Sequence, residues 1–265
     1  MNIRTLIIPD LHLKWQKADK IISHVAADKI VFLGDYFDDF GDNPITNQVM
    51  AEWVKNSLDQ PNRIHLMGNH DTNYAFRHRS YKCSGYTSAK EQSINTILKE
   101  GDWRKMPLYT KVGSWLCSHA GVHNHLYEQY GNKLDFYKWL DHACNVALET
   151  AFANKPAVSI LRAGSSRGGT ETVGGINWCD ADEFRAIASI NQVFGHTPQT
   201  EPRWINTGSS LSKQYSQNLC LDVGNANCYA IHDSDTDKIK EYHIGEQIKY
   251  EQCYESSSKT TTFVK

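Results

Sequence analysis

Five short apolar runs in this sequence each end in side chains that can bind a metal ion. The first three are followed by Asp10-Leu11-His12, by Gly34-Asp35-Tyr36-Phe37-Asp38 and by Gly68-Asn69-His70-Asp71. Two later runs end in Ser118-His119-Ala120-Gly121 and in Gly195-His196-Thr197. Carboxylate, carboxamide and imidazole groups without thiolates suit borderline and hard divalent ions such as manganese, iron or zinc. The pattern therefore predicts a metal site assembled from segments that lie far apart in the chain.

The elements that would position these groups alternate between strands and helices. Apolar runs at 3–9, 29–33 and 63–67 predict buried strands, and the spacing of apolar residues at 16–27 and 45–58 predicts helices between them. This alternation is typical of parallel βαβ units. In a parallel sheet the carboxyl ends of the strands share one edge, so we expect all five groups to meet at one rim.

The remainder of the chain follows the same signals. Residues 163–175 hold five glycines and are expected to form a loop. Helices are expected at 88–101 and 135–153. Strands are expected at 107–112, 114–118, 190–194, 203–206, 218–222, 227–232 and 239–243.

Length and composition limit the classes of protein that fit. The chain has 265 residues, of which 40% are apolar and 22% charged, which excludes a disordered, collagen-like or coiled-coil protein. Lys and Arg total 28 against 30 Asp and Glu, giving a net charge of −2. We therefore expect neither a strong general affinity for nucleic acid nor binding to an anionic membrane.

The apolar segments and the cysteines indicate the cellular location of the protein. The run Leu6-Ile7-Ile8 is too short for a signal peptide, and no segment approaches the roughly 20 apolar residues of a membrane helix. The seven cysteines include no C-x₂-C pair, so we interpret them as reduced thiols rather than a zinc knuckle. These features predict a cytoplasmic protein without a membrane partner.

The five motifs together resemble a known family. The order D-x-H, G-D-x-x-D, G-N-H-D, S-H-A-G and G-H-T is similar to the calcineurin-like metallophosphoesterase superfamily. The spelling H-A-G followed by F-G-H-T-P most resembles the bacteriophage lambda-type protein phosphatases and the symmetrical dinucleoside tetraphosphate hydrolases. The resemblance extends over roughly residues 3–232, although only the motif blocks are specific.

The resemblance implies an α/β fold, namely a four-layered α/β/β/α sandwich with a helical and looped cap. On this basis residues 1–250 form a single domain and the cap is an insertion at about 123–189. Residues 251–265 are a polar tail. Because the core motifs are generic, the cap is expected to select the substrate.

The resemblance also implies a ligand set and a mechanism. It implies two divalent ions, expected to be manganese, with iron, zinc, nickel or cobalt as alternatives. The ligands would be Asp10, His12 and Asp35 for the first ion, and Asp35, Asn69, His119 and His196 for the second. A hydroxide bridging the ions would attack phosphorus, and His70 would protonate the leaving alkoxide. Asp38 would orient His70, because a nearby carboxylate raises the pKa of an imidazole.

Two departures from the family pattern concern phosphate binding. Protein phosphatases of this family usually have G-D-x-x-D-R-G, but Asp39 stands here where the phosphate-binding Arg would be. A carboxylate there would repel a phosphate group. A second Arg often follows a Trp, but here Trp178 is followed by Cys179-Asp180. The candidate replacements are Arg77, Arg79, Arg162 and Arg167, the last of which lies in the glycine-rich loop.

The substrate class stays open between several alternatives. A phosphomonoesterase is favoured, acting on a phosphorylated small molecule, nucleotide or phosphoprotein. A phosphodiesterase or dinucleoside polyphosphate hydrolase is the alternative, supported by aromatic residues near Tyr74 that could stack on a nucleobase, although core packing would explain them equally. A non-catalytic metal-binding scaffold is a third alternative, against which the intact pair His70 and Asp38 argues.

Overall fold

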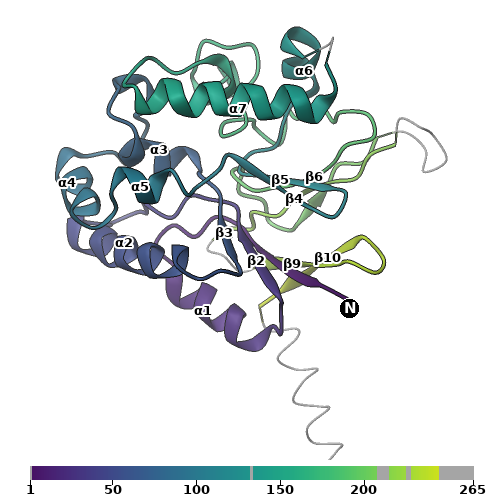
Figure 1. Ribbon diagram of the computed structural model, residues 1–265, viewed down its shortest axis with the longest axis horizontal. Coiled ribbons are helices and arrows are strands. Elements are labelled where there is room, and N and C mark those ends of the chain that lie inside the picture. Colours follow the sequence, from purple (N-terminus) through teal and green to yellow (C-terminus); the bar gives the residue numbers. More distant parts are fainter. Residues whose placement is uncertain (1, 132–133, 208–214, 225–227, 245–265) are drawn as a thin grey trace, which may run out of the picture.

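The computed structural model consists of two β-sheets that pack face to face between layers of helices (Figure 1). It describes residues 2–131, 134–207, 215–224 and 228–244. The expected polar tail at 251–265 lies outside the described residues. Within the described part of the chain, no helix combines the length and apolar character needed to cross a membrane.

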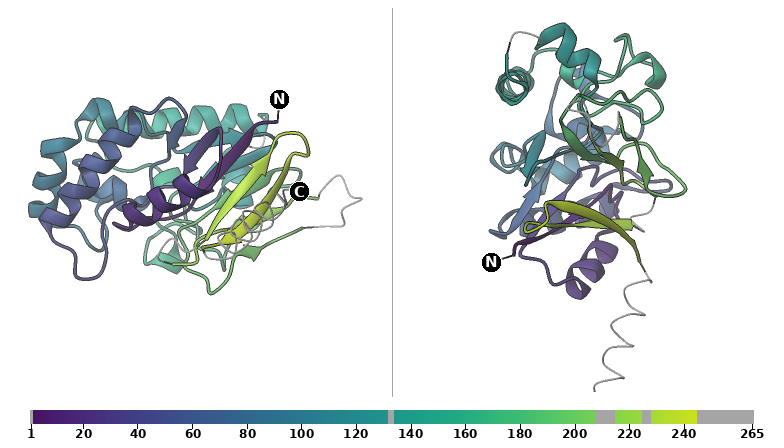
Figure 2. Two further views of the ribbon diagram at one scale, coloured as in Figure 1. Left: turned by 90° about the horizontal axis from the view of Figure 1, so that it is seen from below. Right: turned by 90° about the vertical axis from the view of Figure 1, so that its right-hand side faces the viewer.

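The first sheet has the order β10-β9-β1-β2-β3. Its strands are β1 (Arg4–Ile8), β2 (Lys29–Phe32), β3 (Arg63–His65), β9 (Cys228–Asp233) and β10 (Lys238–His243). The three N-terminal strands are parallel, and β9 joins them antiparallel to β1. Figure 2 shows the purple N-terminal strand beside the yellow-green strands from the far end of the sequence.

The second sheet has the order β4-β5-β6-β8-β7. Its strands are β4 (Tyr109–Val112), β5 (Trp115–Ser118), β6 (Asn191–Phe194), β7 (Arg203–Trp204) and β8 (Asn218–Cys220). The hairpin of β4 and β5 turns at Gly113, whose φ of +57° is easy only for a residue without a side chain. Because β5 and β6 are parallel, their carboxyl ends lie at the same edge.

Alternating side chains on each strand build two separate apolar layers. On β1, Leu6 and Ile8 point to the helical side, whereas Ile7 packs in the layer between the sheets. Val31 of β2 and Val193 of β6 lie in that same inter-sheet layer. Both faces of these strands are therefore buried, which explains why their sequences are apolar without a polar alternation.

The helices cover the outer faces of the sandwich. They are α1 (Trp15–His24), α2 (Pro44–Leu58), α3 (Asn69–Ala75), α4 (Ser88–Ile97), α5 (Glu100–Trp103), α6 (Asn124–Tyr130) and α7 (Phe136–Phe152). Figure 1 shows α1 and α2 below the first sheet and α7 along the opposite side, above the second. The helix expected at 88–101 is divided into α4 and α5, since Leu98 and Lys99 have extended backbones.

The mixed α/β sandwich predicted from the sequence is confirmed, but its site is built differently from a single rim. The segments that carry Asp10, Asp35 and Asn69 follow strands of the first sheet, whereas His119 and His196 follow β5 and β6 of the second. The two sheets must therefore pack correctly before the five motifs can meet.

One buried carboxylate fixes the loops of the first sheet to each other. The side chain of Asp71 is 0% exposed and accepts backbone N–H groups from Asp35 at 2.8 Å, Tyr36 at 2.9 Å and Gly68 at 2.7 Å. It thus caps the start of α3 and holds the turn after β2 against it. This link sets the distance between the second and third motifs.

Candidate metal centre and active site

Three side chains from the ends of β1 and β2 form a first cluster of possible ligands. One ligand atom from each of Asp10, His12 and Asp35 lies within 4.8 Å of the others. The Nδ1 atom of His12 lies 2.7 Å from the carbonyl oxygen of Asp38, so the proton is on Nδ1. This tautomer leaves Nε2 free to face Asp35 Oδ2, 3.8 Å away.

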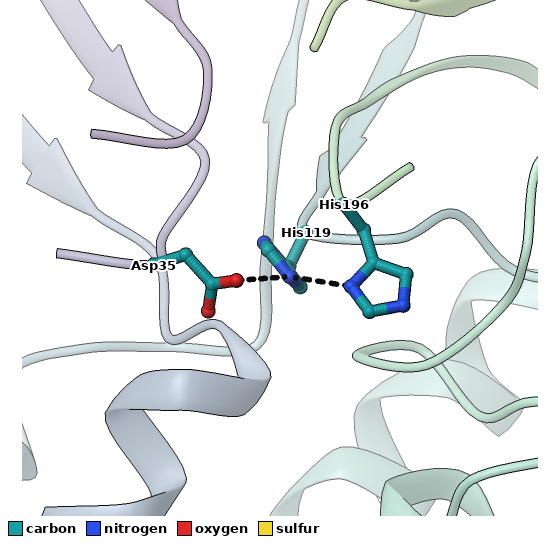
Figure 3. Close-up of side chains that lie close together, drawn as sticks. All are labelled: Asp35, His119 and His196. Atoms are coloured by element: carbon teal, nitrogen blue, oxygen red, sulfur yellow. Dashed lines mark hydrogen bonds and ion pairs between the residues drawn. The ribbon is translucent and has the colours of Figure 1, made fainter. Parts of the chain in front are cut away.

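A second cluster combines Asp35 with two histidines from the other sheet. Figure 3 shows His119 lying between Asp35 and His196, and the ligand atoms of all three lie within 4.8 Å of one another. The Nε2 atom of His119 lies 3.3 Å from Asp35 Oδ2 and 3.1 Å from His196 Nδ1. Asn69 completes the group, with its Oδ1 atom 2.9 Å from the same nitrogen.

Asp35 belongs to both clusters. Its Oδ2 atom faces His12 on one side and His119 on the other, while Oδ1 accepts the backbone N–H of His70 at 2.8 Å. Carboxylates in this position bridge ions about 3.5–4 Å apart in two-metal hydrolases. The structure thus brings together all six predicted ligands, with Asp35 at their centre.

The donor set fits divalent cations. His119 Nδ1 lies 3.1 Å from the Leu33 carbonyl oxygen, so a neutral His119 directs the lone pair of Nε2 at the oxygens of Asp35 and Asn69. Lone pairs gathered in this way repel each other unless a cation lies among them. His196 Nε2 is also buried without a hydrogen-bond partner among the described residues.

The pKa values of the clustered side chains also favour a metal site. Burial and the neighbouring Asp222 carboxylate raise the pKa of Asp10 to about 7. Burial opposes the charged forms of both Asp35 and His119, but the attraction between them outweighs it. It lowers the pKa of Asp35. The carboxylates of Asp35 and Asp10 together raise the pKa of His119 to about 10. A buried, negatively charged cluster that retains protons in this way exchanges them for metal ions.

Next to the clusters, His70 and Asp38 form a pair. His70 Nδ1 lies 3.0 Å from Asp38 Oδ2. Burial works against a charged imidazole, but the Asp35 and Asp38 carboxylates outweigh it and raise the pKa of His70. The side chains of His70 and His12 are 19% and 33% exposed, whereas the other predicted ligands are almost completely buried. Solvent therefore reaches the clusters from the side of these two imidazoles.

The comparisons with known proteins decide the family. The profile described as calcineurin-like phosphoesterase matches residues 3–200, which is more than half of the 265 residues. The chain belongs to the calcineurin-like phosphoesterase family. As a member it is a metal-dependent phosphoesterase, a hydrolase, and its two clusters fit that dependence. A search of curated proteins finds no significant match.

Several solved structures are similar to this chain over most of its length, at low sequence identity. A protein provisionally named a diadenosine tetraphosphatase is 16% identical, with a TM-score of 0.46 and coverage of 91% of this chain and 93% of its own. A metallophosphoesterase from Sphaerobacter thermophilus is 16% identical, with a TM-score of 0.43 and coverage of 97% and 94%. A serine/threonine phosphatase from Saccharomyces cerevisiae with similarity to human phosphatase PP5 is 14% identical, with a TM-score of 0.45 and coverage of 92% and 81%.

In this calcineurin-like phosphoesterase, Arg167 lies at the edge of the second cluster. It ends a short 3₁₀ turn, Ser165–Arg167, inside the segment expected to be a loop. Its guanidinium forms an ion pair with Asp180 at 2.7 Å and donates to Thr197 Oγ1 at 3.0 Å, beside His196. The side chain is 28% exposed. Asp180, two residues after Trp178, therefore pairs with an arginine from the glycine-rich loop.

Asp39 is compensated in a similar way. Its carboxylate pairs with the ammonium group of Lys14 and accepts a hydrogen bond from the backbone N–H of Phe40 at 2.8 Å. The repulsion of phosphate expected from Asp39 is therefore largely neutralised.

The two other predicted substrate contacts lie elsewhere. The Tyr74 ring is 2% exposed and packs against Phe37 with ring centroids 5.6 Å apart, so it offers no open face to a nucleobase. Its hydroxyl instead donates to Asp38 Oδ1. Arg77 is exposed and lies two residues beyond the C-terminal end of α3. The packing of Tyr74 against Phe37 explains why its ring does not face a substrate.

Two residues that bind Asp38 were not predicted from the sequence. Lys90 and Asn73 both donate hydrogen bonds to its carboxylate. Lys90 follows Asp38 by 52 residues and lies on a helix with no motif, so only the fold could reveal the contact. The pairing of Arg167 with Asp180 needs the loop to fold back, which no local pattern encodes.

The shared position of Asp35 predicts how metal binding fails. We expect Asp35→Asn to bind less than one manganese ion per chain, because the amide removes the negative charge from both clusters at once. The wild type is expected to bind two, as measured by elemental analysis after dialysis. Asp182→Asn serves as the matched control, since Asp182 is 83% exposed and pairs with Arg203. Unchanged stoichiometry in Asp35→Asn would contradict the bridging position.

Proposed function

We propose that this phosphoesterase hydrolyses phosphomonoesters with two divalent ions, manganese being the first candidate, and with His70 as general acid. The proposal rests mainly on the pair of His70 and Asp38, which stands directly beside the two clusters that share Asp35. A protein that only stored or displayed metal ions would have no use for an oriented, proton-carrying imidazole at this point.

Each ion would have its own set of ligands, with one ligand in common. Asp10 and His12 would serve the first ion and Asn69, His119 and His196 the second, with Asp35 shared. Bound ions of this kind supply a nucleophile at neutral pH and offset the charge on the phosphoryl group. The buried ligands are fixed by bonds to the backbone, such as those from His196 N–H to the Asp10 carboxylate, each 3.1 Å long.

His70 is placed to hold and deliver a proton. Its Nδ1 proton is donated to Asp38, so the Nε2 side of the ring is available to the leaving oxygen of the substrate. The raised pKa of His70 favours the imidazolium form, whose second proton is on Nε2 and is the one transferred to the leaving oxygen. Proton donation of this kind contributes about 10²–10⁴-fold to the rate.

Arg167 favours a dianionic substrate. Its guanidinium donates to Thr197. Burial and the charge of His119 lower the pKa of His196, and the charge of Arg167 adds to this effect. Arginine binds phosphate oxygens through several N–H groups at once, and a phosphomonoester carries more negative charge than a diester. We therefore assign Arg167 as the cation that takes the place of the family's phosphate-binding arginine.

A panel of three substrates tests the proposal. With Mn²⁺ we expect faster hydrolysis of p-nitrophenyl phosphate than of bis-p-nitrophenyl phosphate or a diadenosine polyphosphate, measured as kcat/KM. Preference for the diester or the anhydride would transfer the assignment to a phosphodiesterase or a dinucleoside polyphosphate hydrolase. Two bound ions with no turnover of any of the three would indicate a metal-binding scaffold.

The role of His70 predicts a dependence on the leaving group. We expect His70→Asn to keep its metal content and to slow phenyl phosphate about 10²–10⁴-fold, but p-nitrophenyl phosphate much less, because p-nitrophenolate leaves without a proton. His24→Asn, at the exposed end of α1, is the matched control. Equal slowing of both substrates would count against general acid catalysis by His70.

The assignment of Arg167 has its own test. We expect Arg167→Met to lower kcat/KM for phenyl phosphate about 10- to 100-fold with unchanged metal content, since a hydrogen bond to a charged group is lost. Arg203→Met removes a comparable but exposed ion pair with Asp182 and is expected to have no effect. If Arg167→Met retained full kcat/KM, another group would have to bind the phosphate.

A further inference from the structure

A buried lysine that belongs to none of the sequence motifs contacts the partner of His70. Lys90 lies in the first turn of α4, and its side chain is only 6% exposed. Its Nζ atom donates to Asp38 Oδ1 at 2.7 Å and to both oxygens of Asp42, at 3.0 and 2.8 Å. One ammonium group therefore joins two carboxylates that lie side by side in the protein interior.

Asp38 receives as many hydrogen bonds as a carboxylate can accept. Oδ2 accepts from His70 and from Asn73 Nδ2, both at 3.0 Å. Oδ1 accepts from Tyr74 and from Lys90. An ionised carboxylate has about four lone-pair sites, so all of them are occupied and each oxygen has a defined set of donors. Any rotation of the Asp38 side chain would break several of these bonds together.

The backbone around Asp38 leaves it little freedom to move. Asp38 itself has a φ of +64°, which is uncommon for a residue with a side chain. The loop before α4 presses on it, because a Cβ atom at Gly85 would lie 2.7 Å from the Asp38 carboxyl carbon. This loop and Lys90 contact the Asp38 carboxyl group from the same part of the chain, with Lys90 on Oδ1 and His70 on Oδ2.

Of the four donors to Asp38, Lys90 is the one that also donates to Asp42, so it is the cation between the two carboxylates. Asp42 also accepts a hydrogen bond from Asn47 Nδ2 at 2.7 Å, but Asn47 carries no charge. Without the ammonium group, Asp38 and Asp42 would face each other across a buried space with no cation between them. Two buried carboxylates with no cation between them repel each other, so the Asp38 side chain would turn away from its present position. That change would remove the acceptor on which the orientation of His70 depends.

We propose that Lys90 is a positioning residue for the hydrolysis: it holds the Asp38 carboxylate in the one orientation that aligns His70 toward the leaving group. The inference rests on the proposed role of His70 as general acid. The hydrogen bonds of Lys90 Nζ go to Asp38 and Asp42 rather than to the predicted metal ligands, so we expect its effect on turnover to pass through Asp38.

A double-mutant cycle tests this path of action. Turnover of phenyl phosphate and p-nitrophenyl phosphate is measured for the wild type, Lys90→Met, His70→Asn and the double variant, each loaded with Mn²⁺. We expect Lys90→Met to lower kcat for phenyl phosphate at least tenfold, with p-nitrophenyl phosphate, KM and metal content little changed. In the His70→Asn background the same substitution is expected to cost less than twofold, because residues that act through one another are not additive.

Conservative and matched variants separate positioning from folding. Lys90→Arg keeps the charge and is expected to restore most of kcat. Lys55→Met removes a lysine that pairs with the buried Asp102 instead, and should leave the leaving-group dependence as in the wild type. Should Lys90→Met not fold, the cycle is run with Lys90→Met/Asp42→Asn, which removes one charge of each sign, against Asp42→Asn.

Each outcome has a distinct meaning. Additive losses from Lys90→Met and His70→Asn, or an undiminished kcat in Lys90→Met, would overturn the role of Lys90 and leave that of His70 intact. If His70→Asn slowed both substrates equally, the general acid itself would be disproved, and the inference about Lys90 would fail with it.

Discussion

The site depends on one constraint: the Asp35 carboxylate must stay ionised inside the protein while facing histidines from both sheets. To reach this position the chain at Asp35 adopts a φ of +52°. The neighbouring turn must come so close that a Cβ atom at Gly68 would lie 2.1 Å from Asp35 Oδ1. A Cβ atom at Gly34 would in turn lie 2.5 Å from the backbone nitrogen of Gly68. The glycines of the second and third motifs are thus explained by close approach of two loops rather than by flexibility.

Strain of this kind is concentrated at the site. His12, Asp35, Asp38 and His196 all have positive φ values, between +39° and +70°. Each such residue costs on the order of 1–3 kcal/mol, and persists only where its surroundings fix it. Those surroundings are the inter-sheet apolar layer and the bonds of Asp71, which hold the loops regardless of what they bind. Preorganisation of this type allows ions to bind without the protein first having to order its ligands.

The convergence of the five motifs could be predicted from the sequence, because each motif directly follows a strand and a strand end is a local signal. The assignment of six ligands and of the pair His70 and Asp38 came from the resemblance to the family. What could not be predicted depends on contacts between distant segments. Whether Tyr74 offers its ring to a substrate or its hydroxyl to Asp38 is decided by packing against Phe37. The contact of Lys90 with Asp38 likewise follows from the placement of α4, which no residue near Asp38 specifies.

The two departures from the family pattern share one feature, namely a carboxylate that is paired with a cation from another segment. Where the resemblance leads us to expect two arginines, this chain has Asp39 and, directly after Trp178, Cys179. The carboxylates at or next to these positions, Asp39 and Asp180, are paired with cations from other segments, namely Lys14 and Arg167. A tethered cation is well placed, but part of its charge is already balanced. If Arg167 binds the substrate as proposed, a phosphate group must compete with Asp180 for it, and a dianion does so better than a monoanion. On this proposal, the charge of the substrate matters more than its shape at this part of the site.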